Sequence, residues 1–326
     1  MAFTSRSLIA VLAAATTWSL PAAARPNPTP CPGAGASTRA EPLDIRDTTD
    51  IAVNIPSVLT ESTLYGAPPN DFTCKSARNP VVLLHGLSAD REVDLNLLQR
   101  ELSTPERGYC TFSATYGAWP LTPWIGGLTD MTESARDIAA FIREVKEKTG
   151  ADKVDVVGHS EGGVQALYVP LSQPGIAALV DHVVALGPAV HGADYFGFTD
   201  LWYVGGDATR ALAKPFSELI FCPACEQMMP DGAITDAFDA ATAAGGIKQE
   251  GNNVTVIMSR SDKLVTPDVS EIDEAGVRNV FVQDTCPDDR VGHAGLAWDK
   301  SVWRLVINAL EKNDDVVFEC EEGLEI

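Results

Sequence analysis

The feature that most constrains the fold lies at residues 153–171, where a β-strand pattern leads into a glycine-flanked serine and then a helical pattern. Residues 158–162 are Gly-His-Ser-Glu-Gly. A serine held on a sharp turn between strand and helix needs small neighbours, because side chains two positions away would collide with the backbone. Gly158, Gly162 and Gly163 meet that need. The segment predicts an exposed nucleophile at Ser160, although an isolated G-x-S-x-G is also compatible with an ordinary turn.

A nucleophilic serine needs a histidine that takes its proton and a carboxylate that orients the histidine. After a serine of this kind, the acid and then the base follow along the chain. Of the five histidines, only His293, in a glycine-flanked loop before a predicted helix, leaves room for an intervening acid. His85 and His159 come too early, and His182 and His191 follow too closely. We therefore predict His293 as the base.

The acid should follow a strand between the serine and this histidine. Residues 254–258 are a β-branched apolar run, and Asp262 follows it closely. Loops at the carboxyl ends of parallel strands line one crevice, so Asp262 is the predicted acid. The competing acids are Asp284, Asp288 and Asp289, which lie so near the histidine that they would crowd its loop.

Two backbone N–H groups are needed for a developing oxyanion. One is expected from Glu161, directly after the nucleophile, and the other from the loop after the apolar strand at residues 80–84. In that loop Leu87 would donate, Gly86 would permit close approach of the backbone, and His85 would brace the loop by hydrogen bonding to backbone.

These pieces together resemble the secreted class 2 lipases of the α/β-hydrolase superfamily, over residues 74–310. The resemblance is carried by Val-Val-Leu-Leu-His-Gly at 81–86, Gly-Tyr-Cys at 108–110, Lys-Val-Asp-Val-Val-Gly-His-Ser at 153–160, Ser-Asp-Lys-Leu-Val-Thr-Pro at 261–267, and Gln-Asp-Thr-Cys-Pro at 283–287 ahead of Gly292 and His293. It implies hydrolysis of carboxylic esters through an acyl-enzyme, with no metal or organic cofactor. It also implies the roles of nucleophile, acid and base for Ser160, Asp262 and His293.

The chain departs from this family at two positions. Many relatives have an amide side chain where this chain has Glu161, and a small residue where it has Leu87. An ionised carboxylate aimed at a developing oxyanion would oppose catalysis in a dry site, so we expect Glu161 to point away or to be protonated. We expect Leu87 to narrow the acyl or alcohol pocket.

The N-terminus predicts export. Arg6 precedes an apolar stretch at residues 8–20, and small residues follow it, so we expect a signal peptide over residues 1–24. The apolar stretch is too short for a stable membrane anchor. The formal net charge is −21, which argues against nucleic acid and anionic membranes as partners. We therefore expect a secreted enzyme that acts on an ester or lipid.

All seven cysteines follow the predicted signal peptide, a pattern that predicts up to three disulfides and one spare thiol in a secreted chain. Cys74 and Cys110 flank the first two predicted strands, so their pairing is plausible. Cys222 and Cys225 could instead form a redox or zinc motif, which we disfavour because no second pair has zinc-like spacing. Sequence does not fix the remaining connectivity.

The predicted fold is α/β, with an N-terminal arm at residues 25–73 and one catalytic domain at 74–326. Strands near residues 81, 111, 154, 183, 254 and 280 alternate with helices, a pattern typical of a largely parallel sheet. We expect one helix to be capped by Asp130 and Glu133 and closed by Gly150, and the last helix to be capped by Asp299.

Residues 187–245 are rich in aromatic side chains and could form a cap over the site, although core packing explains them equally well. A cap would favour a triacylglycerol lipase, and its absence a general carboxylesterase or polyester hydrolase. The alternative hypotheses are a peptidase or acyltransferase that uses the same serine, acid and histidine, and a non-catalytic binding protein on a hydrolase scaffold.

Overall fold

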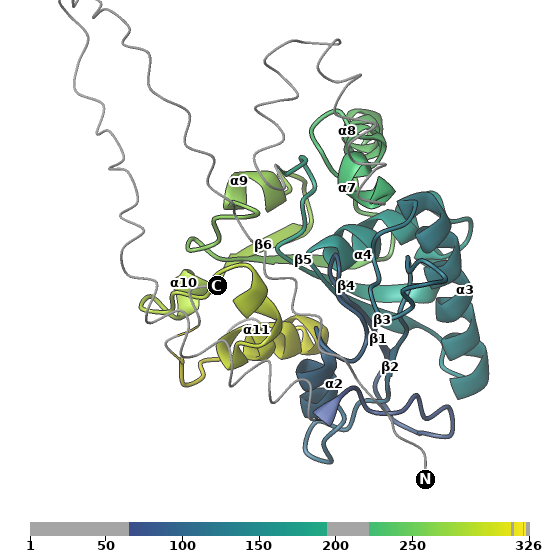
Figure 1. Cartoon of the computed structure of the whole chain (residues 1–326). Coiled ribbons are helices and arrows are strands. Elements are labelled where there is room, and N and C mark those ends of the chain that lie inside the picture. The colour runs from purple at the N-terminus through teal and green to yellow at the C-terminus, as the bar shows by residue number, and fades with distance from the viewer. Residues whose placement is uncertain (1–64, 194–221, 314–315, 322, 324–326) are drawn as a thin grey trace, which may run out of the picture. The chain divides into compact units, whose positions relative to one another are not determined.

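The computed structural model of the chain describes residues 65–193, 222–313, 316–321 and 323. Its centre is a six-stranded sheet with the order β2-β1-β3-β4-β5-β6, in which all neighbouring strands are parallel (Figure 1). The strands are β1 (Val81–Leu84), β2 (Thr111–Ser113), β3 (Val154–His159), β4 (Val180–Leu186), β5 (Asn253–Met258) and β6 (Val277–Phe281). The predicted α/β fold is confirmed, with a strand at each of the six expected positions.

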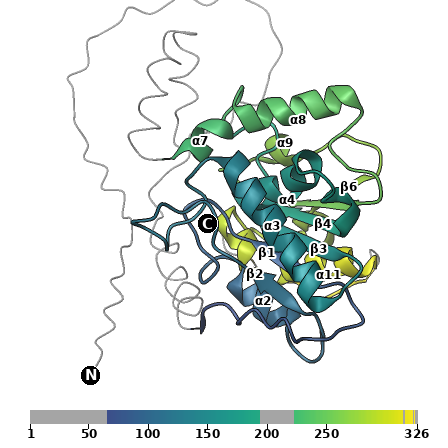
Figure 2. The ribbon, with the colours of Figure 1, turned by 90° about the vertical axis from the view of Figure 1, so that its right-hand side faces the viewer.

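Helices cover both faces of this sheet. They are α2 (Asn96–Leu102), α3 (Met131–Thr149), α4 (Glu161–Ser172), α7 (Pro223–Gln227), α8 (Ala233–Ala244), α9 (Pro267–Ser270), α10 (Val282–Thr285) and α11 (Lys300–Glu311), with short 3₁₀ turns η1 (Ala177–Leu179) and η2 (Ala294–Ala297). The helices α3, α4, α7 and α8 pack with Val82 and Leu84 in one hydrophobic cluster, whereas α2 and α11 pack with Val81 and Leu83 in another. Figure 2 faces the side that α3 covers. Both faces of β1 are therefore buried, which explains its unbroken apolar sequence.

The strand order reverses between β1 and β3. From β1 the chain moves outward to β2, returns to the other side of β1 as β3, and then continues through β4, β5 and β6. A crevice forms outside the carboxyl ends of the strands at such a reversal. The loop that follows β1 and the turn that follows β3 both lie at this reversal, at the carboxyl ends of the two strands.

Two helix starts were predicted from their capping residues. Asp130 accepts hydrogen bonds from the N–H groups of Thr132 and Glu133 at 2.8 and 3.1 Å, and α3 ends at the left-handed Gly150. Asp299 caps α11 by accepting from the N–H of Val302 at 3.1 Å. Both predictions are confirmed.

Three disulfides join the six cysteines of the described residues. The pairing of Cys74 with Cys110 is confirmed. Cys222 pairs with Cys225, and Cys286 with Cys320, two pairings that the sequence left open. The first and third close loops of 36 and 34 residues, for which chain entropy predicts about 3–4 kcal/mol of stabilisation each. Cys31 lies outside the described residues.

Several predicted segments are not tested by the structure. The predicted signal peptide and nearly all of the N-terminal arm lie outside the described residues, as does the centre of the aromatic segment at 194–221. The described remainder of that segment includes α7 and α8, which pack into the core against α3 and α4 through side chains such as Ala224 and Phe238. Within the described residues, none of the helices has the length and apolarity needed to cross a membrane.

Candidate active site

The backbone of Ser160 is strained. This residue follows β3 directly and has φ 55° and ψ −120°, a conformation that costs a non-glycine residue about 1–3 kcal/mol. Its N–H donates to the carbonyl of Leu186 at 2.8 Å, which ties the turn to β4. A Cβ on Gly158 would lie 2.0 Å from the carbonyl oxygen of Gly162, and one on Gly162 would lie 2.2 Å from that of Leu84. Only glycine fits at these two positions, as required by the predicted sharp turn between strand and helix at Ser160, termed the nucleophile elbow.

Ser160, His293 and Asp262 form one hydrogen-bonded row. The Nε2 atom of His293 lies 2.8 Å from Oγ of Ser160, and its Nδ1 lies 2.7 Å from Oδ2 of Asp262. The N–H groups of Leu264 and Val265 donate to Oδ1 of Asp262 at 2.9 and 2.8 Å, which leaves Oδ2 to the histidine. With the proton on Nδ1, Nε2 can accept the serine proton. All three side chains are buried.

The competing acids lie elsewhere. Asp284 is exposed and forms an ion pair with Arg260 at 2.7 Å. Asp289 is buried, and its Oδ1 accepts from the N–H of Val291 at 2.9 Å. Within the described residues, the ring nitrogens of His293 hydrogen-bond to the other two members of the row and not to these acids.

The loop of residues 85–89, termed the oxyanion loop after the role predicted for Leu87, lies against the serine. A Cβ on Gly86 would be 3.2 Å from Cβ of Ser160. The Nδ1 atom of His85 faces the carbonyl oxygen of Gly86 at 2.9 Å, and its Nε2 accepts from the N–H of Tyr116 at 3.2 Å. His85 therefore braces the loop through backbone hydrogen bonds, as predicted. Among the described residues, no acceptor takes the N–H of Leu87.

The N–H of Glu161 has no acceptor among these residues either, while the side chain of Glu161 is fully buried. A Cβ on Gly127 would be 2.1 Å from its Oε2, so the carboxyl group packs directly on the Gly127 backbone, beside Leu87. Burial raises the pKa of this carboxyl well above its usual value. The side chain of Gln165 lies next to it, but the Gln165 amide donates to the carbonyl of Met131 at 3.0 Å.

Glu161 and Gln165 thus bring together oxygens that lack donors. Both carboxyl oxygens of Glu161 and Oε1 of Gln165 are buried without a hydrogen-bond donor among the described residues. A protonated Glu161 carboxyl avoids burying an ionised group that lacks a donor. The geometry and the raised pKa agree with the expectation that Glu161 is protonated.

A second buried pair escaped sequence analysis. Asp94 accepts from the N–H of Gly86 at 2.7 Å through Oδ2, and its Oδ1 lies 3.0 Å from Nδ1 of His159. The Nε2 atom of His159 lies 3.0 Å from the carbonyl oxygen of His293. His159 diverges from the serine, as predicted, but Asp94 stands in a run of charged residues that resembles a solvated loop, and no pattern distinguishes it.

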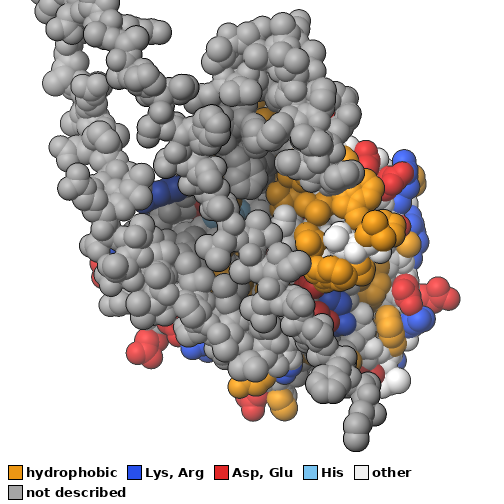
Figure 3. All heavy atoms as spheres, viewed as in Figure 1, with side chains coloured by type: hydrophobic (Ala, Val, Ile, Leu, Met, Phe, Trp, Pro, Cys, Tyr) orange, Lys and Arg blue, Asp and Glu red, His pale blue; other side chains and the backbone are white. Residues whose placement is uncertain are grey.

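Apolar side chains are exposed on loops near this site. Leu121 and Trp124 lie on the loop that precedes Gly126, whose backbone pairs with Ser88 and Ala89 of the oxyanion loop. Leu264 follows the predicted acid by two residues and is also exposed. Figure 3 shows hydrophobic side chains gathered on one face of the described part.

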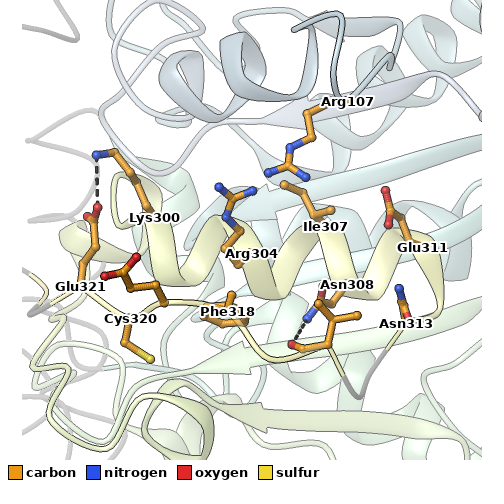
Figure 4. Close-up of a pocket in the computed structure, with 12 residues that line it drawn as sticks. Arg107, Lys300, Arg304, Ile307, Asn308, Glu311, Asn313, Phe318, Cys320 and Glu321 are labelled. Carbon is orange, nitrogen blue, oxygen red and sulfur yellow. Dashed lines mark hydrogen bonds and ion pairs between the residues drawn. The ribbon is translucent and has the colours of Figure 1, made fainter.

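A separate cavity of about 500 Å³ lies between α11 and residues 316–321 (Figure 4). Three cations line it, and each forms an ion pair: Arg107 and Arg304 with Glu101 at 2.9 and 3.7 Å, and Lys300 with Glu321 at 3.2 Å. None of the residues of the Ser160 row lines this cavity. We assign it no ligand, because its charges are already neutralised.

Comparison with known proteins agrees with this geometry. A family model described as the alpha/beta hydrolase fold matches residues 79–220. Triacylglycerol lipases of Pseudarthrobacter phenanthrenivorans and Burkholderia plantarii are each 29% identical over 129 residues, which is 39% of this chain. The match spans only 38% and 34% of the length of these two relatives.

Solved structures with the same fold include lipase B of Aspergillus fumigatus, with a TM-score of 0.57 and 17% identity, covering 76% of this chain and 55% of that one. They also include a mature lipase of Bacillus licheniformis, with a TM-score of 0.52 and 16% identity, covering 75% of this chain and 96% of that one. At such identities the likeness concerns the fold alone. Together with the parallel sheet and the turn at Ser160, these matches show that the chain has the α/β-hydrolase fold.

Proposed function

We propose that this chain is a serine hydrolase of carboxylic esters, with triacylglycerols as its substrates. The observation that carries the proposal is the hydrogen-bonded row of Ser160, His293 and Asp262 on a strained elbow. Triacylglycerol lipases are the curated relatives with which the chain shares 29% identity. The exposed Leu121 and Trp124 near the oxyanion loop fit an apolar acyl chain better than a polar substrate.

The proposed reaction has two halves. Oγ of Ser160 attacks the ester carbonyl while Nε2 of His293 takes the hydroxyl proton, and Asp262 orients the ring and stabilises its charge. The N–H groups of Leu87 and Glu161 hold the oxyanion. Collapse of the tetrahedral intermediate breaks the bond to the alcohol, which leaves with the proton from His293. Water, deprotonated by the same histidine, then releases the acid and regenerates the serine.

Export and family are part of the proposal. Three disulfides among the described residues fit an oxidising compartment, in line with the expected signal peptide at residues 1–24. Assignment to the secreted class 2 lipases rests on the sequence motifs and stays a prediction.

The test is hydrolysis of p-nitrophenyl esters of short, medium and long acyl chains by the wild type and by Ser160→Ala. We expect activity that rises toward long chains and is lost in the variant. A maximum at short chains would favour a general carboxylesterase or polyester hydrolase. Activity that survives in Ser160→Ala, or a wild type that hydrolyses none of these esters, would contradict the proposal.

A further inference from the structure

We propose that Asp94 and His159 are positioning residues for ester hydrolysis, and that their buried pair fixes the oxyanion loop relative to the loop that carries His293. The inference rests on the proposed function, since it assigns these two side chains a role in the same reaction. Neither side chain reaches the serine, so both would act through other groups.

The pair forms a continuous link between two parts of the site. It begins at the N–H of Gly86, which Asp94 accepts at 2.7 Å. It continues from Asp94 to Nδ1 of His159 at 3.0 Å, and it ends at the carbonyl oxygen of His293, 3.0 Å from Nε2. Gly86 directly precedes the proposed oxyanion donor Leu87, and the other end of the link is the backbone of the proposed base. The side chains of Asp94 and His159 thus join the oxyanion loop to the loop that carries His293.

The hydrogen-bond partners of the pair require a charged His159 when Asp94 is ionised. A backbone carbonyl only accepts, so Nε2 of His159 must carry a proton to bond with His293. An ionised Asp94 also only accepts, so Nδ1 must carry one too. A neutral imidazole has a single N–H, and both bonds therefore form together when His159 is an imidazolium and Asp94 is ionised.

The electrostatic environment agrees with this assignment. Burial would raise the pKa of Asp94, but the charge and hydrogen bond of His159 outweigh burial and hold that pKa below its usual value. Burial would lower the pKa of His159, but the charge and hydrogen bond of Asp94 raise it above its usual value. Both side chains are about 5% exposed, so water does not compete for their hydrogen bonds.

A further contact strengthens the link. The indole Nε1 of Trp298 donates to the carbonyl oxygen of Asp94 at 3.0 Å. Trp298 closes the short turn η2, which directly follows His293. The segment before Asp94 is therefore held to the segment after His293 as well.

Other titratable groups face the pair from neighbouring elements. His85, Asp90 and Tyr116 interact electrostatically with Asp94, and Asp262 interacts with His159. The ring of His293 lies 5.1 Å from that of His159, centroid to centroid. A pH profile alone would mix these groups, so the test compares variants and observes His159 directly.

The kinetic test uses Asp94→Asn, His159→Gln and the double variant. A misplacement of about 1 Å in a catalytic constellation costs about 100-fold in rate, so we expect each single variant to lower kcat by about that factor with little change in KM. The double variant should lose no more than either single variant, because both break the same link. Asp155→Asn, in a buried Asp–His pair remote from the serine, is the matched control and should keep the wild-type kcat.

Folded Asp94→Asn and His159→Gln variants with wild-type kcat would overturn the positioning role, as would losses that simply multiply in the double variant. Circular dichroism of each variant establishes that it is folded.

A second measurement needs neither a variant enzyme nor a substrate. In the ¹⁵N NMR spectrum of the wild-type histidines, with the His159 signals assigned by through-bond correlation to the backbone, we expect both ring nitrogens of His159 to be protonated at neutral pH. A neutral His159 would overturn the proposal even if the variants do not fold. If the wild type hydrolyses no ester, the proposed function fails, and the NMR result still decides whether the ion pair exists.

Discussion

The two ends of the sheet each hold a buried Asp–His pair of nearly the same geometry. At the carboxyl ends of the strands, Nδ1 of His293 lies 2.7 Å from Asp262, and at the amino ends Nδ1 of His182 lies 2.8 Å from Asp155. The pairs differ in what the other ring nitrogen faces. Nε2 of His293 faces the strained Ser160 at 2.8 Å, whereas Nε2 of His182 is buried without a partner in the described residues.

The surroundings of the two carboxylates differ as well. Asp155 accepts from the N–H of His182 and from the side-chain amide of Asn79, both at 3.0 Å, and neighbouring Asp181 accepts from Asn253 at 2.9 Å. The side-chain ligand atoms of Asp155, Asp181 and His182 lie close enough together to hold a metal ion. The hydrogen-bond donors named above already occupy the two carboxylates, so we assign no metal ion to this cluster. An Asp–His pair therefore does not by itself support an active site, whereas the partner hydroxyl on strained backbone supports the one proposed at Ser160.

The largest difference in kcat should appear when each of the two histidines is replaced in turn. His293→Gln should lower kcat by a factor on the order of 10⁶, the size of effect typical of a triad histidine. His182→Gln should leave kcat unchanged, because no reacting group lies near it. Steady-state kinetics on a medium-chain p-nitrophenyl ester compares the two variants. Equal losses in both would mean that the difference between the two ends is not catalytic.

The acids give the next comparison. Asp262→Asn should lower kcat about 10⁴-fold, because an amide favours the wrong tautomer of His293. Asp155→Asn should keep kcat but lower the melting temperature, since a buried carboxylate that accepts three hydrogen bonds is replaced by an amide.

Asp284→Asn serves as the control for the competing acid. Its side chain is exposed, and its ion pair with Arg260 lies at the surface, so the substitution should change neither activity nor stability measurably. An inactive Asp284→Asn beside a fully active Asp262→Asn would reverse the assignment of the acid.

The elbow predicts a smaller effect that depends on space alone. A Cβ on Gly158 would meet the Gly162 carbonyl at 2.0 Å, but one on Gly163 would meet its nearest atoms at 3.3 Å, a tight contact that a shift of a few tenths of an ångström relieves. Gly158→Ala should therefore lose activity together with folded protein, whereas Gly163→Ala should remain folded and active. Circular dichroism and ester hydrolysis of both variants provide the test, and an active Gly158→Ala would show that the elbow can relax.

Local patterns in the sequence predicted the fold well. Apolar runs at the six strand positions, and the capping residues Asp130 and Asp299, act over a few residues, so the printed sequence contains their full signal. The Cys74–Cys110 pairing was accessible for the same reason, since both cysteines lie beside strands that pair with each other. The short-range pairing of Cys222 with Cys225 was not, because the same spacing suits several chemistries.

The site was predictable only where chemistry fixes the order of residues. Ser160, Asp262 and His293 follow a strand-turn-helix motif, a strand end and a glycine-flanked loop, and the structure brings these three together. Asp94 has no such marker. Its hydrogen-bond partners, Gly86 and His159, are 8 and 65 residues away in the sequence. Its burial follows from tertiary packing that no local pattern encodes.

The smallest effect is expected from replacing Glu161, a buried carboxyl whose oxygens have no hydrogen-bond donor in the described residues. At the amino ends of the strands, by contrast, the carboxylates of Asp155 and Asp181 accept hydrogen bonds. Because burial raises the pKa of Glu161, the folded chain keeps a proton that the unfolded chain releases. Wild-type stability should therefore fall as the pH rises from the usual value of a glutamate toward this raised pKa. A glutamine side chain cannot ionise, so the Glu161→Gln variant should match the wild type at acidic pH and melt at a higher temperature at alkaline pH.

Calorimetry of Glu161→Gln and wild type at acidic and alkaline pH measures this difference. The same ionisation would bring a negative charge beside Leu87 and the proposed oxyanion donors, so Glu161→Gln should also retain kcat further into the alkaline range. A constant difference in melting temperature across the range would mean that the pKa of Glu161 is the same in the folded and the unfolded chain. The carboxyl would then have to be ionised when buried, with no donor among the described residues to stabilise it.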